Sequence, residues 1–550
     1  MVAFATDKYS GTPAARELYK SGKKAMNSGD TNKALADYEK AIQLDPNYAE
    51  PYNDLLFLRT YVAMKSVGEL SMHTTKAQQA EMKRKTEPIK EAYKKQYEAL
   101  SKEHPNNPIY LFALSRLYYE DDPAHQEELC KQALQADKDF TPAYDCLSAV
   151  ASLGGDYAQA ADYYRHVVDA HPNDPDVMSK YIYFLHDNPE QYKKAVDELL
   201  AKFPDSDEAA SALYGYAYSQ QNTPAQQAVF EELVNRFPPA RFSTSKDAEE
   251  ALFIDYDQTD PAKALALAHE MTKQFPNEKD TTWKDYTAYA DTMADAEQKL
   301  ASGHAAEAVA LLATVNLDKM GRVFDKTRFL LLQSRALAAE DKLPDAYSIL
   351  FTAVASWPTD KTQSALLEYG AKLGKSEAQV NSELWKARSD AALPEKPFTL
   401  TDLATGQKVS LSDYRGRVVI LDFFFPNCGP CRASYPYLQR LHNEFRRQNV
   451  ALLAVNGVDG QASFVVPMFK KLNLDFTPLE GGDKFCSDVY HIRGYPTTLL
   501  IGTDGRVYFA DEVKLKDGSV YMRSHYWNDQ SARSFALEIE ALLHPPGHTN

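Results

Sequence analysis

The spacing of apolar residues divides the chain into two regions with different predicted structures. Through about residue 390, apolar side chains recur at helical spacings, and prolines stand near the predicted helix ends. Residues 393–397 contain two prolines that break this pattern, and short apolar runs with turn signals follow. The pattern predicts an all-α region over residues 1–391 and a mixed α/β domain over residues 392–550.

Phe-Pro dipeptides recur along the helical region. They occupy residues 203–204, 237–238 and 275–276. Pro204 and Pro238 are separated by 34 residues, a period that is typical of stacked helix pairs. Each such pair buries its apolar face against the next pair, so the period predicts a helical solenoid.

Residues 16–46 carry this pattern most clearly. Gly22 stands at a small position of the first helix, and the apolar positions of the second helix precede a proline, as follows: Ala34, Tyr38, Ala41 and Pro46. Ala160, Tyr164 and Pro172 repeat the same spacing. These positions resemble the tetratricopeptide (TPR) family. The resemblance implies an array whose concave groove, lined by the first helices, binds a peptide or a protein.

Helix pairs continue beyond Pro276, and we expect about eight or nine repeats in all. The later helices are predicted at residues 283–300, 305–315, 326–339 and 344–357, with a helical cap over residues 361–391. The tyrosines and phenylalanines of this region are interpreted as core residues of the solenoid, because they fall at helical spacings, rather than as a ligand-binding cluster.

The C-terminal region alternates predicted strands and helices. Strands are predicted at residues 418–425 and 450–456, helices at 428–448, 462–472 and 531–543, and hairpins over 398–411 and 497–510. The second hairpin turns through Asp504-Gly505, a signal for a type I′ turn. This alternation implies a mixed sheet covered by helices.

Two cysteines, Cys428 and Cys431, follow the first of these strands in the sequence Cys-Gly-Pro-Cys. If a helix begins there, Cys428 lies at its positive end, where a thiolate is favoured and where we expect the side chain to be exposed. Cys431 lies one turn later and can close a disulfide. Pro430 is compatible with a first helical turn, where its missing N–H costs nothing. The motif predicts thiol–disulfide exchange.

The cysteine motif, together with Tyr495-Pro496-Thr497 further along, resembles the thioredoxin superfamily. The leading hairpin and the insertion over residues 460–483 resemble the TlpA-like redoxins, which are related to the AhpC/TSA proteins. The resemblance implies that Cys428 is the attacking thiol and Cys431 the resolving one. It also implies a cis-proline at Pro496.

The residues around that proline are implied to bind the substrate. A cis bond before Pro496 would turn the backbone of Tyr495 towards an extended client segment, and Thr497 and Pro430 complete the expected binding surface. One departure stands out, because Asn427 replaces the tryptophan that is usual before the first cysteine. The sequence therefore does not determine the reduction potential of the cysteine pair or the strength of substrate binding.

Two acidic residues are candidates for tuning the thiols. Asp422 lies six residues before Cys428 on a strand that should be buried, where a desolvated carboxylate can relay a proton for Cys431. The alternative is a charge that is partly exposed at the end of the strand. Asp459 matches an acidic position near the thiols in some TlpA-like redoxins, and the alternative is an ordinary loop aspartate.

The other three cysteines are expected to be structural. Cys130 is predicted in the second helix of one pair and Cys146 in the first helix of the next. We expect them to pack as small apolar side chains, while a bridge between them stays an alternative for an exported protein. Cys486 is expected to be buried in a helix, with regulatory or mixed-disulfide chemistry as the alternative.

The composition limits the possible binding partners of the protein but does not identify its cellular compartment. The formal net charge of −16 argues against nucleic-acid binding, and no apolar run reaches the length of a membrane helix. No leader is visible at the N-terminus, which is compatible with a cytoplasmic protein, whereas the family resemblance favours the bacterial cell envelope. No metal motif appears, and no cofactor is expected besides the Cys428–Cys431 disulfide.

Three functions are compatible with these features. The first is a thiol–disulfide oxidoreductase, in the reducing direction, whose TPR array recruits protein clients and which receives electrons from an upstream thiol donor. The second is a TPR scaffold with a redox-sensing module. The third and weakest is a thiol peroxidase, because the spacing Pro-x-x-x-Thr-x-x-Cys is absent: counted from Pro426, those positions hold Pro430 and Ala433.

Overall fold

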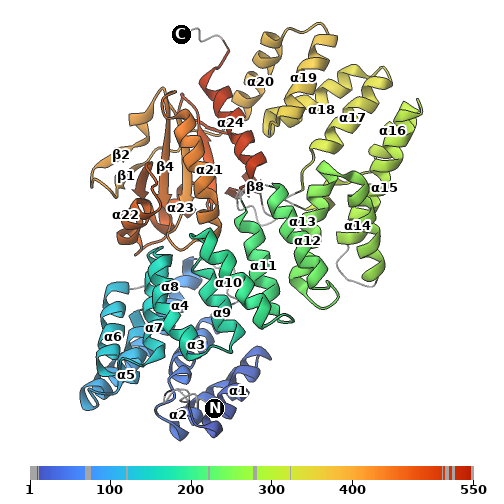
Figure 1. The fold of residues 1–550 in the computed structure, drawn as a ribbon. Helices are drawn as coiled ribbons and strands as arrows, with labels where there is room; N and C mark the ends of the chain where they lie inside the picture. The colour runs from blue at the N-terminus through green and yellow to red at the C-terminus, as the bar shows by residue number, and fades with distance from the viewer. Residues whose placement is uncertain are drawn as a thin grey trace. The chain divides into compact units, whose positions relative to one another are not determined.

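A computed structural model describes most of the chain (Figure 1). The described residues are 9, 11–68, 76–118, 122–220, 223–276, 282–321, 324–510, 512–514, 520–522 and 527–546. They form two compact units, Met1–Asp187 and Asn188–Asn550. The first unit is all-α, and the second contains further helices followed by a mixed sheet.

The first unit consists of consecutive helices that pack as neighbours. Its helices are α1 (Pro13–Asn27), α2 (Thr31–Leu44), α3 (Glu50–Lys65), α4 (Lys76–Glu103), α5 (Pro108–Ser115), α6 (Pro123–Ala136), α7 (Thr141–Leu153), α8 (Tyr157–Ala170) and α9 (Pro175–Tyr183), with a short 3₁₀ turn η1 (Arg116–Tyr118). Gly22 of α1 lies against Tyr38 of α2, and a Cβ at Gly22 would come within 2.5 Å of that ring. The small position predicted at Gly22 is therefore required for close packing of the first pair.

The residues that carry the repeat pattern are buried, as predicted. Ala34, Tyr38 and Ala41 are fully buried, and Ala160 and Tyr164 are buried in the later pair.

Cys130 of α6 and Cys146 of α7 are joined by a disulfide, with their Cα atoms 6.4 Å apart. The expectation that they pack only as small apolar side chains was wrong. Both lie in the predicted helices, and both are fully buried. The packing of α6 on α7 brings two inward-facing sulfurs together, and this contact between helices could not be derived from their sequence separation.

Among the residues that the structure describes, the second unit begins with eleven α-helices. They are α10 (Pro189–Lys202), α11 (Asp207–Ser219), α12 (Thr223–Arg236), α13 (Ser243–Thr259), α14 (Pro261–Gln274), α15 (Thr282–Ala301), α16 (Ala305–Leu312), α17 (Thr327–Ala339), α18 (Leu343–Ser356), α19 (Asp360–Lys372) and α20 (Glu377–Ala391), with a 3₁₀ turn η2 (Leu317–Met320). The predicted later helices correspond to α15–α18, and the predicted cap comprises α19 and α20. Among the described residues, eighteen α-helices precede this cap, as nine pairs would.

The rest of the second unit is an α/β domain with the thioredoxin-like alternation that was predicted. Its elements are β1 (Thr399–Asp402), β2 (Lys408–Ser410), η3 (Leu411–Tyr414), β3 (Val418–Phe424), α21 (Gly429–Phe445), β4 (Val450–Asn456), α22 (Ala462–Lys471), β5 (Thr477–Glu480), α23 (Gly482–Val489), β6 (Thr497–Ile501), β7 (Val507–Tyr508), β8 (Glu512–Lys514), β9 (Val520–Met522) and α24 (Asp529–Leu543). Seven strands form one sheet in the order β2-β1-β5-β4-β3-β6-β7. β3 is an interior strand that lies between β4, to which it is parallel, and β6, to which it is antiparallel.

Side chains of β3 alternate between two hydrophobic clusters. Val418, Ile420 and Phe424 lie in a cluster with residues of α21, α22 and α24. Val419, Leu421 and Phe423 lie in a second cluster on the other face of the sheet, which includes Cys486 of α23. Because the side-chain period of a strand is two, the even-numbered positions of β3 face α21.

One predicted turn differs from the structure. The hairpin of β6 and β7 was expected to turn through a type I′ turn, which needs positive φ at both Asp504 and Gly505. Only Gly505 has a positive φ (85°). Its N–H donates to the carbonyl of Gly502, and the Asp504 carboxylate accepts from the N–H of Arg506, so the tight turn spans residues 502–505.

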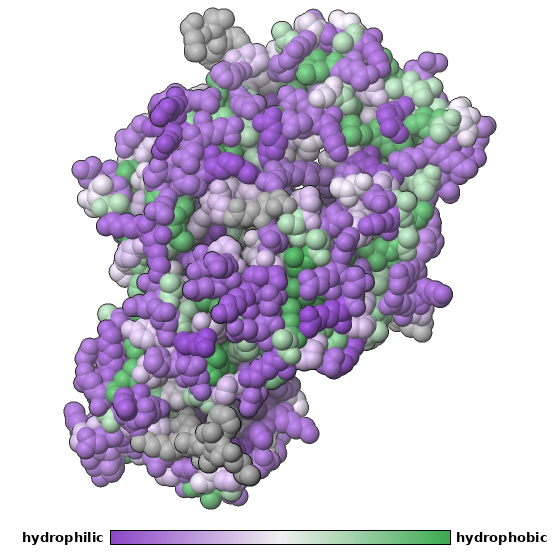
Figure 2. Space-filling model, in the orientation of Figure 1, coloured by the Kyte–Doolittle hydropathy of each residue, from purple (hydrophilic) through white to green (hydrophobic). Residues whose placement is uncertain are grey.

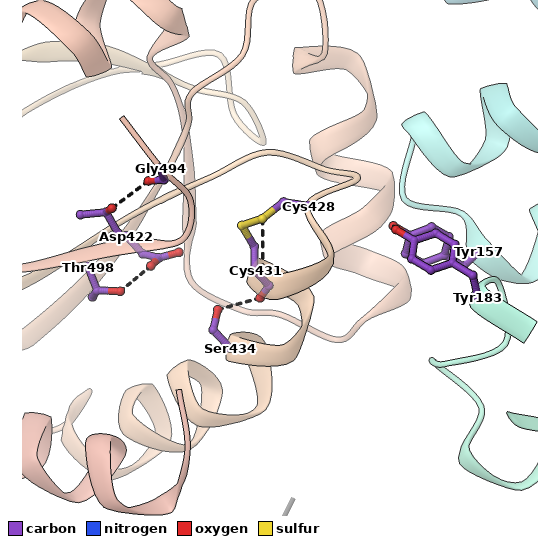
Figure 3. Close-up of a disulfide and its surroundings, with 9 residues drawn as sticks. Tyr157, Tyr183, Asp422, Cys428, Cys431, Ser434, Gly494 and Thr498 are labelled. Atoms are coloured by element: carbon purple, nitrogen blue, oxygen red, sulfur yellow. Dashed lines mark hydrogen bonds between the residues drawn. A yellow bond between two sulfur atoms is a disulfide. The ribbon is translucent and has the colours of Figure 1, made fainter. Parts of the chain in front are cut away.

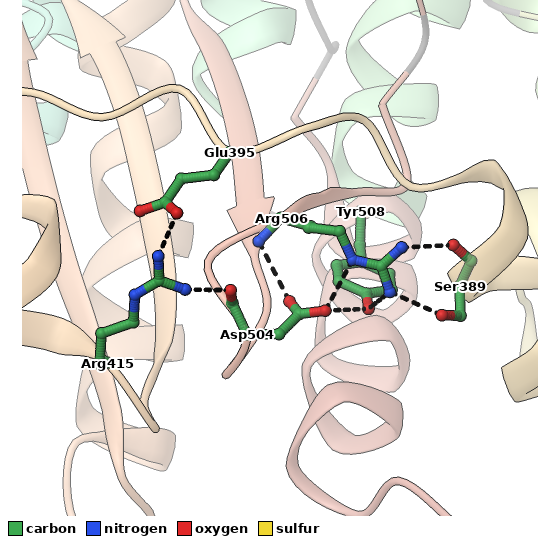
Figure 4. Close-up of polar contacts among 6 residues, drawn as sticks. All are labelled: Ser389, Glu395, Arg415, Asp504, Arg506 and Tyr508. Atoms are coloured by element: carbon green, nitrogen blue, oxygen red, sulfur yellow. Dashed lines mark hydrogen bonds and ion pairs between the residues drawn. The ribbon is translucent and has the colours of Figure 1, made fainter.

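The helical cap and the α/β domain are joined by specific contacts within the second unit (Figure 4). The Arg506 guanidinium donates to the carbonyl and hydroxyl oxygens of Ser389, at 2.8 and 2.6 Å. The same guanidinium pairs with Asp504, which also accepts from the Tyr508 hydroxyl at 2.9 Å. Trp385 of α20 stacks on Tyr508, with ring centroids 5.6 Å apart. The sequence-based boundary at residues 391/392 stays a prediction.

The surface is polar over most of the face shown in Figure 2, with small hydrophobic patches between the polar areas. None of the described helices combines the length and the apolar character that are needed to cross a bilayer.

The Cys130–Cys146 disulfide leads to a prediction about thiol counts. The chain has five cysteines, of which only Cys486 is free in the structure. Oxidised protein that is unfolded without reductant should therefore expose one reactive thiol, and five after reduction. Peptide mapping without reduction should join the two peptides that contain Cys130 and Cys146. A variant with Cys428 and Cys431 both changed to Ser should keep that link. Alkylation of Cys130 and Cys146 without prior reduction would contradict the pairing.

Candidate active site

The Cys428–Cys431 pair lies at the N-terminus of α21, directly after β3 (Figure 3). Cys428 is the N-cap residue, and its Sγ accepts a hydrogen bond from the N–H of Cys431 at 3.1 Å. The two sulfurs are bonded, with Cα atoms 5.2 Å apart. Pro430 lies in the first helical turn, as predicted. The unpaired N–H groups and the positive end of the helix dipole favour negative charge on the Cys428 sulfur after reduction.

The expectation that Cys428 is exposed was wrong for this oxidised state. Cys428 is only 3 % exposed and Cys431 is fully buried. Both belong to the hydrophobic cluster on the α21 face of the sheet, together with Phe424 and Tyr435. Apolar packing around the N-terminus of α21 thus covers a sulfur that the helix position alone suggests is accessible.

The peptide bond between Tyr495 and Pro496 is cis, which confirms the conformation expected from the resemblance. The Tyr495 hydroxyl donates to the carbonyl of Gly457 at 3.1 Å, and its ring meets Phe425 edge to face at 5.4 Å. Thr497 is fully buried, and its hydroxyl donates to the carbonyl of Gly494 at 2.8 Å. Thr497 therefore stabilises the turn before the cis-proline, and substrate binding by Tyr495, Pro430 and Thr497 stays a prediction.

Asp422 is fully buried in the middle of β3 and not at an exposed strand end. It occupies an even-numbered position, and Figure 3 shows its carboxylate between Thr498 and Cys431. The Thr498 hydroxyl donates to Asp422 Oδ1 at 2.7 Å. Among the described residues, Oδ2 has no hydrogen-bond partner. Burial raises the pKa of Asp422 to about 7, and the Thr498 hydrogen bond opposes that rise. A carboxyl with this pKa can both accept and release a proton near neutral pH.

Asp459 lies on the same side of the site as Tyr495. Among the described residues, it is not in contact with Cys428 or Cys431. The negative charges of Asp459 and Asp483 raise the pKa values of Tyr495 and Cys486, although burial is the main cause for both. A Cβ at Gly482 would come within 2.2 Å of an Asp459 oxygen, so this loop packs closely. The tuning role of Asp459 stays a prediction.

Cys486 is buried as expected, and it is free. Burial raises the pKa of its thiol to about 12. A thiol in this state is a poor nucleophile, which agrees with the structural interpretation.

Two residues at the site were not identified from the sequence. Thr498 donates to the buried acid, and Ser434 donates to the carbonyl of Cys431 at 2.6 Å. A signal for Thr498 exists, because it stands with Thr497 in a short strand whose other residues are apolar. Its partner depends on the pairing of β6 with β3, where Asp422 and Thr498 are opposite each other.

No group of three or more His, Cys, Asp or Glu side chains in the described part of the chain is arranged to hold a metal ion.

Comparisons with known proteins agree with both regions. Residues 391–510 match the model of the AhpC/TSA family, and residues 22–55 match that of the TPR repeat. The thiol-disulfide oxidoreductase ResA of Bacillus subtilis (strain 168) is 33 % identical over 111 residues, which cover 20 % of this chain and 60 % of the relative. The ResA protein of Geobacillus kaustophilus (strain HTA426) is 36 % identical over 111 residues, covering 20 % of this chain and 62 % of that relative.

The chain therefore spans about 60 % of the length of these curated relatives. Among solved structures, a putative thiol:disulfide interchange protein DsbE from Chlorobium tepidum aligns with 24 % identity and a TM-score of 0.23, over 28 % of this chain and 99 % of that one. A putative thioredoxin from Neisseria meningitidis aligns with 25 % identity and the same TM-score, over 28 % of this chain and 93 % of that one.

The burial of Asp422 predicts a pH-dependent stability. Asp422 has its usual pKa of 3.8 in the unfolded chain and a pKa of about 7 in the folded protein. Between these two pH values, the folded state therefore binds more protons than the unfolded state. Stability therefore falls as the pH rises through this window. Asp422→Asn removes the ionisable group while keeping an oxygen for the Thr498 hydroxyl. At pH 8 we expect the oxidised variant to be more stable than the wild type by on the order of 4 kcal/mol.

Calorimetry of the oxidised proteins from pH 4 to pH 8 measures this difference. The gap between variant and wild type should shrink steadily towards pH 4. Parallel pH dependences of the two proteins would show that Asp422 is not the titrating group.

Proposed function

We propose that this chain is a thiol–disulfide oxidoreductase that reduces disulfides of protein clients through the Cys428–Cys431 pair. The observation that carries the proposal is the placement of a Cys-Gly-Pro-Cys pair at a helix N-terminus beside a fully buried carboxyl, Asp422. The similarity to the ResA proteins supports the same chemistry.

The reaction begins from the reduced pair. The Cys428 thiolate attacks one sulfur of a client disulfide, so that a mixed disulfide forms and the first client sulfur leaves as a thiolate. Asp422 takes the proton of the Cys431 thiol, and the Cys431 thiolate attacks the Cys428 sulfur. The Cys428–Cys431 disulfide forms and the second client sulfur leaves. Two electrons pass to the client, and two protons convert its two thiolates to thiols. An upstream thiol donor then reduces the pair again.

Several features support a role of the helical repeats in binding clients. Repeats of the TPR family are associated with protein interaction, and residues 22–55 match that family. Of the four large apolar side chains that are most exposed among the described residues, three lie on the first helices of their pairs. They are Phe57 on α3, Tyr183 on α9 and Tyr218 on α11. First helices line the concave side of such arrays, so these aromatic side chains are candidate client contacts.

The Cys130–Cys146 disulfide bears on the compartment. Structural disulfides persist in oxidising compartments and are rare in the cytosol. A second, buried disulfide besides the redox pair therefore supports a location outside the cytoplasm, such as the cell envelope. In that setting the upstream thiol donor is required, because the surroundings keep dithiols oxidised.

The assignment of attacking and resolving thiols can be tested by trapping. Cys431→Ser removes the resolving thiol, so Cys428 should remain joined to a synthetic peptide that carries one internal disulfide. Intact-mass spectrometry should find most of this variant as the adduct, and the adduct should disappear with dithiothreitol. Cys428→Ser is the matched control and should form little or no adduct. A stable adduct of the Cys428→Ser variant alone would reverse the assignment.

The direction of the reaction can be tested by the reduction potential of the pair. Titration in dithiothreitol redox buffers, read out by alkylation of Cys428, should give a two-electron midpoint near that of thioredoxin, about −270 mV. A midpoint well above about −200 mV would point to an oxidant or an isomerase. Absence of a reversible two-electron transition would favour a scaffold with a redox-sensing module over an enzyme.

A further inference from the structure

Asp422 and Thr498 are polar residues on a largely apolar face of the sheet, the face that α21 covers. Asp422 and Thr498 are opposite each other on antiparallel strands, and both are buried. Thr498 lies two residues before Leu500, which belongs to the hydrophobic cluster on the α21 face. Both side chains therefore point to the face that carries the cysteine pair.

The two oxygens of the Asp422 carboxylate have different surroundings. Oδ1 accepts a hydrogen bond from the Thr498 hydroxyl at 2.7 Å, whereas Oδ2 has no hydrogen-bond partner among the described residues. An unpaired buried oxygen is costly and uncommon in native structures, and it calls for an explanation. In the view of Figure 3, the carboxylate lies between Thr498 and Cys431.

We propose that Thr498 is a positioning residue that holds Asp422 Oδ1 and thereby reserves Oδ2 for proton exchange with Cys431. A carboxylate has no proton to give, so the hydroxyl must donate to it. When the carboxyl is protonated, the same hydrogen bond survives only if the proton is on Oδ2. The Thr498 hydroxyl therefore fixes both the orientation of the carboxyl and the atom that carries its proton. This inference rests on the proposed role of Asp422 in proton transfer.

The charged groups around the carboxyl do not offer another explanation. The neighbour of Asp422 on β4 is Ala454, and on β6 it is Thr498. On α21, Figure 3 shows Cys431 on the side of the carboxylate that faces away from Thr498. Burial raises the pKa of Asp422 and Thr498 lowers it, and no charged side chain of the described residues contributes. The ionisation of Asp422 thus depends first on burial and then on one hydroxyl group.

The test compares Thr498→Val with Thr498→Ser. Valine keeps the branched shape that suits a buried strand and removes the donor, whereas serine keeps the donor and serves as the rescue variant. The carboxyl C=O stretch of protonated Asp422, isolated by infrared difference against Asp422→Asn, reports its ionisation directly in the oxidised protein. We expect Thr498→Val to move that titration upward by about 1 pH unit, and Thr498→Ser to stay close to the wild type.

A kinetic readout connects this shift to the reaction. The rate at which the mixed disulfide with the synthetic peptide is resolved should rise with pH as Asp422 ionises. In Thr498→Val the rising limb should move up by the same amount, which slows resolution at pH 7 about fivefold. In an Asp422→Asn background the Thr498→Val change should have no further effect on the pH profile.

The possible outcomes distinguish the positioning role of Thr498 from proton transfer by Asp422. An unchanged infrared titration in Thr498→Val overturns the positioning role of Thr498, whatever the activity. A shifted titration with an unshifted rate profile overturns proton transfer by Asp422 while the hydrogen bond to Thr498 stands. Loss of oxidoreductase activity from the wild type itself would leave the infrared test intact and would reject the proposed function instead.

Discussion

Because successive side chains of a strand point to opposite faces of the sheet, the register of β3 decides which groups meet the disulfide helix. Even-numbered residues of β3 face α21, and they are apolar except for Asp422. A shift of one residue would place Asp422 in the other cluster and bring Phe423 under the cysteines. The pairing of β3 with both β4 and β6 prevents such a shift. The chemistry of the site therefore depends on strand register as much as on the cysteine motif.

The helical cap takes part in the same architecture. Trp357 and Trp385 pack against the hydrophobic cluster that contains the cysteine pair. Asp360 of α19 forms an ion pair with Arg533 of α24 at 2.9 Å, and Trp357 meets Phe535 edge to face at 5.7 Å. Inside the second unit, the last helices therefore cover apolar surface of the α/β domain. A change in composition along the chain marks a change in secondary structure, but it does not by itself separate two hydrophobic cores.

Local sequence patterns predicted most helices and strands. The features that were missed depend mainly on contacts between segments that are distant in the sequence. β3 and β4 were predictable because they are long apolar runs, and the helix after Cys428 because of its periodicity. β5 was missed because it is short and contains Pro478. The Cys130–Cys146 bridge and the contact of Thr498 with Asp422 join residues 16 and 76 positions apart. Sequence spacing indicates that such residues are buried or polar, but only the fold shows which of them meet.

The number of hydrogen bonds to Asp422 determines whether its carboxyl can both accept and release a proton near neutral pH. A carboxylate that accepts several donors is held ionised far below neutral pH and cannot give its proton back. A carboxylate without any donor would be more strongly destabilised by burial and would stay protonated at neutral pH. One hydroxyl, from Thr498, lies between these limits, and burial still raises the pKa of Asp422 to about 7. The unpaired Oδ2 weakens the fold, and the same atom is what makes a reversible proton acceptor next to Cys431 chemically possible.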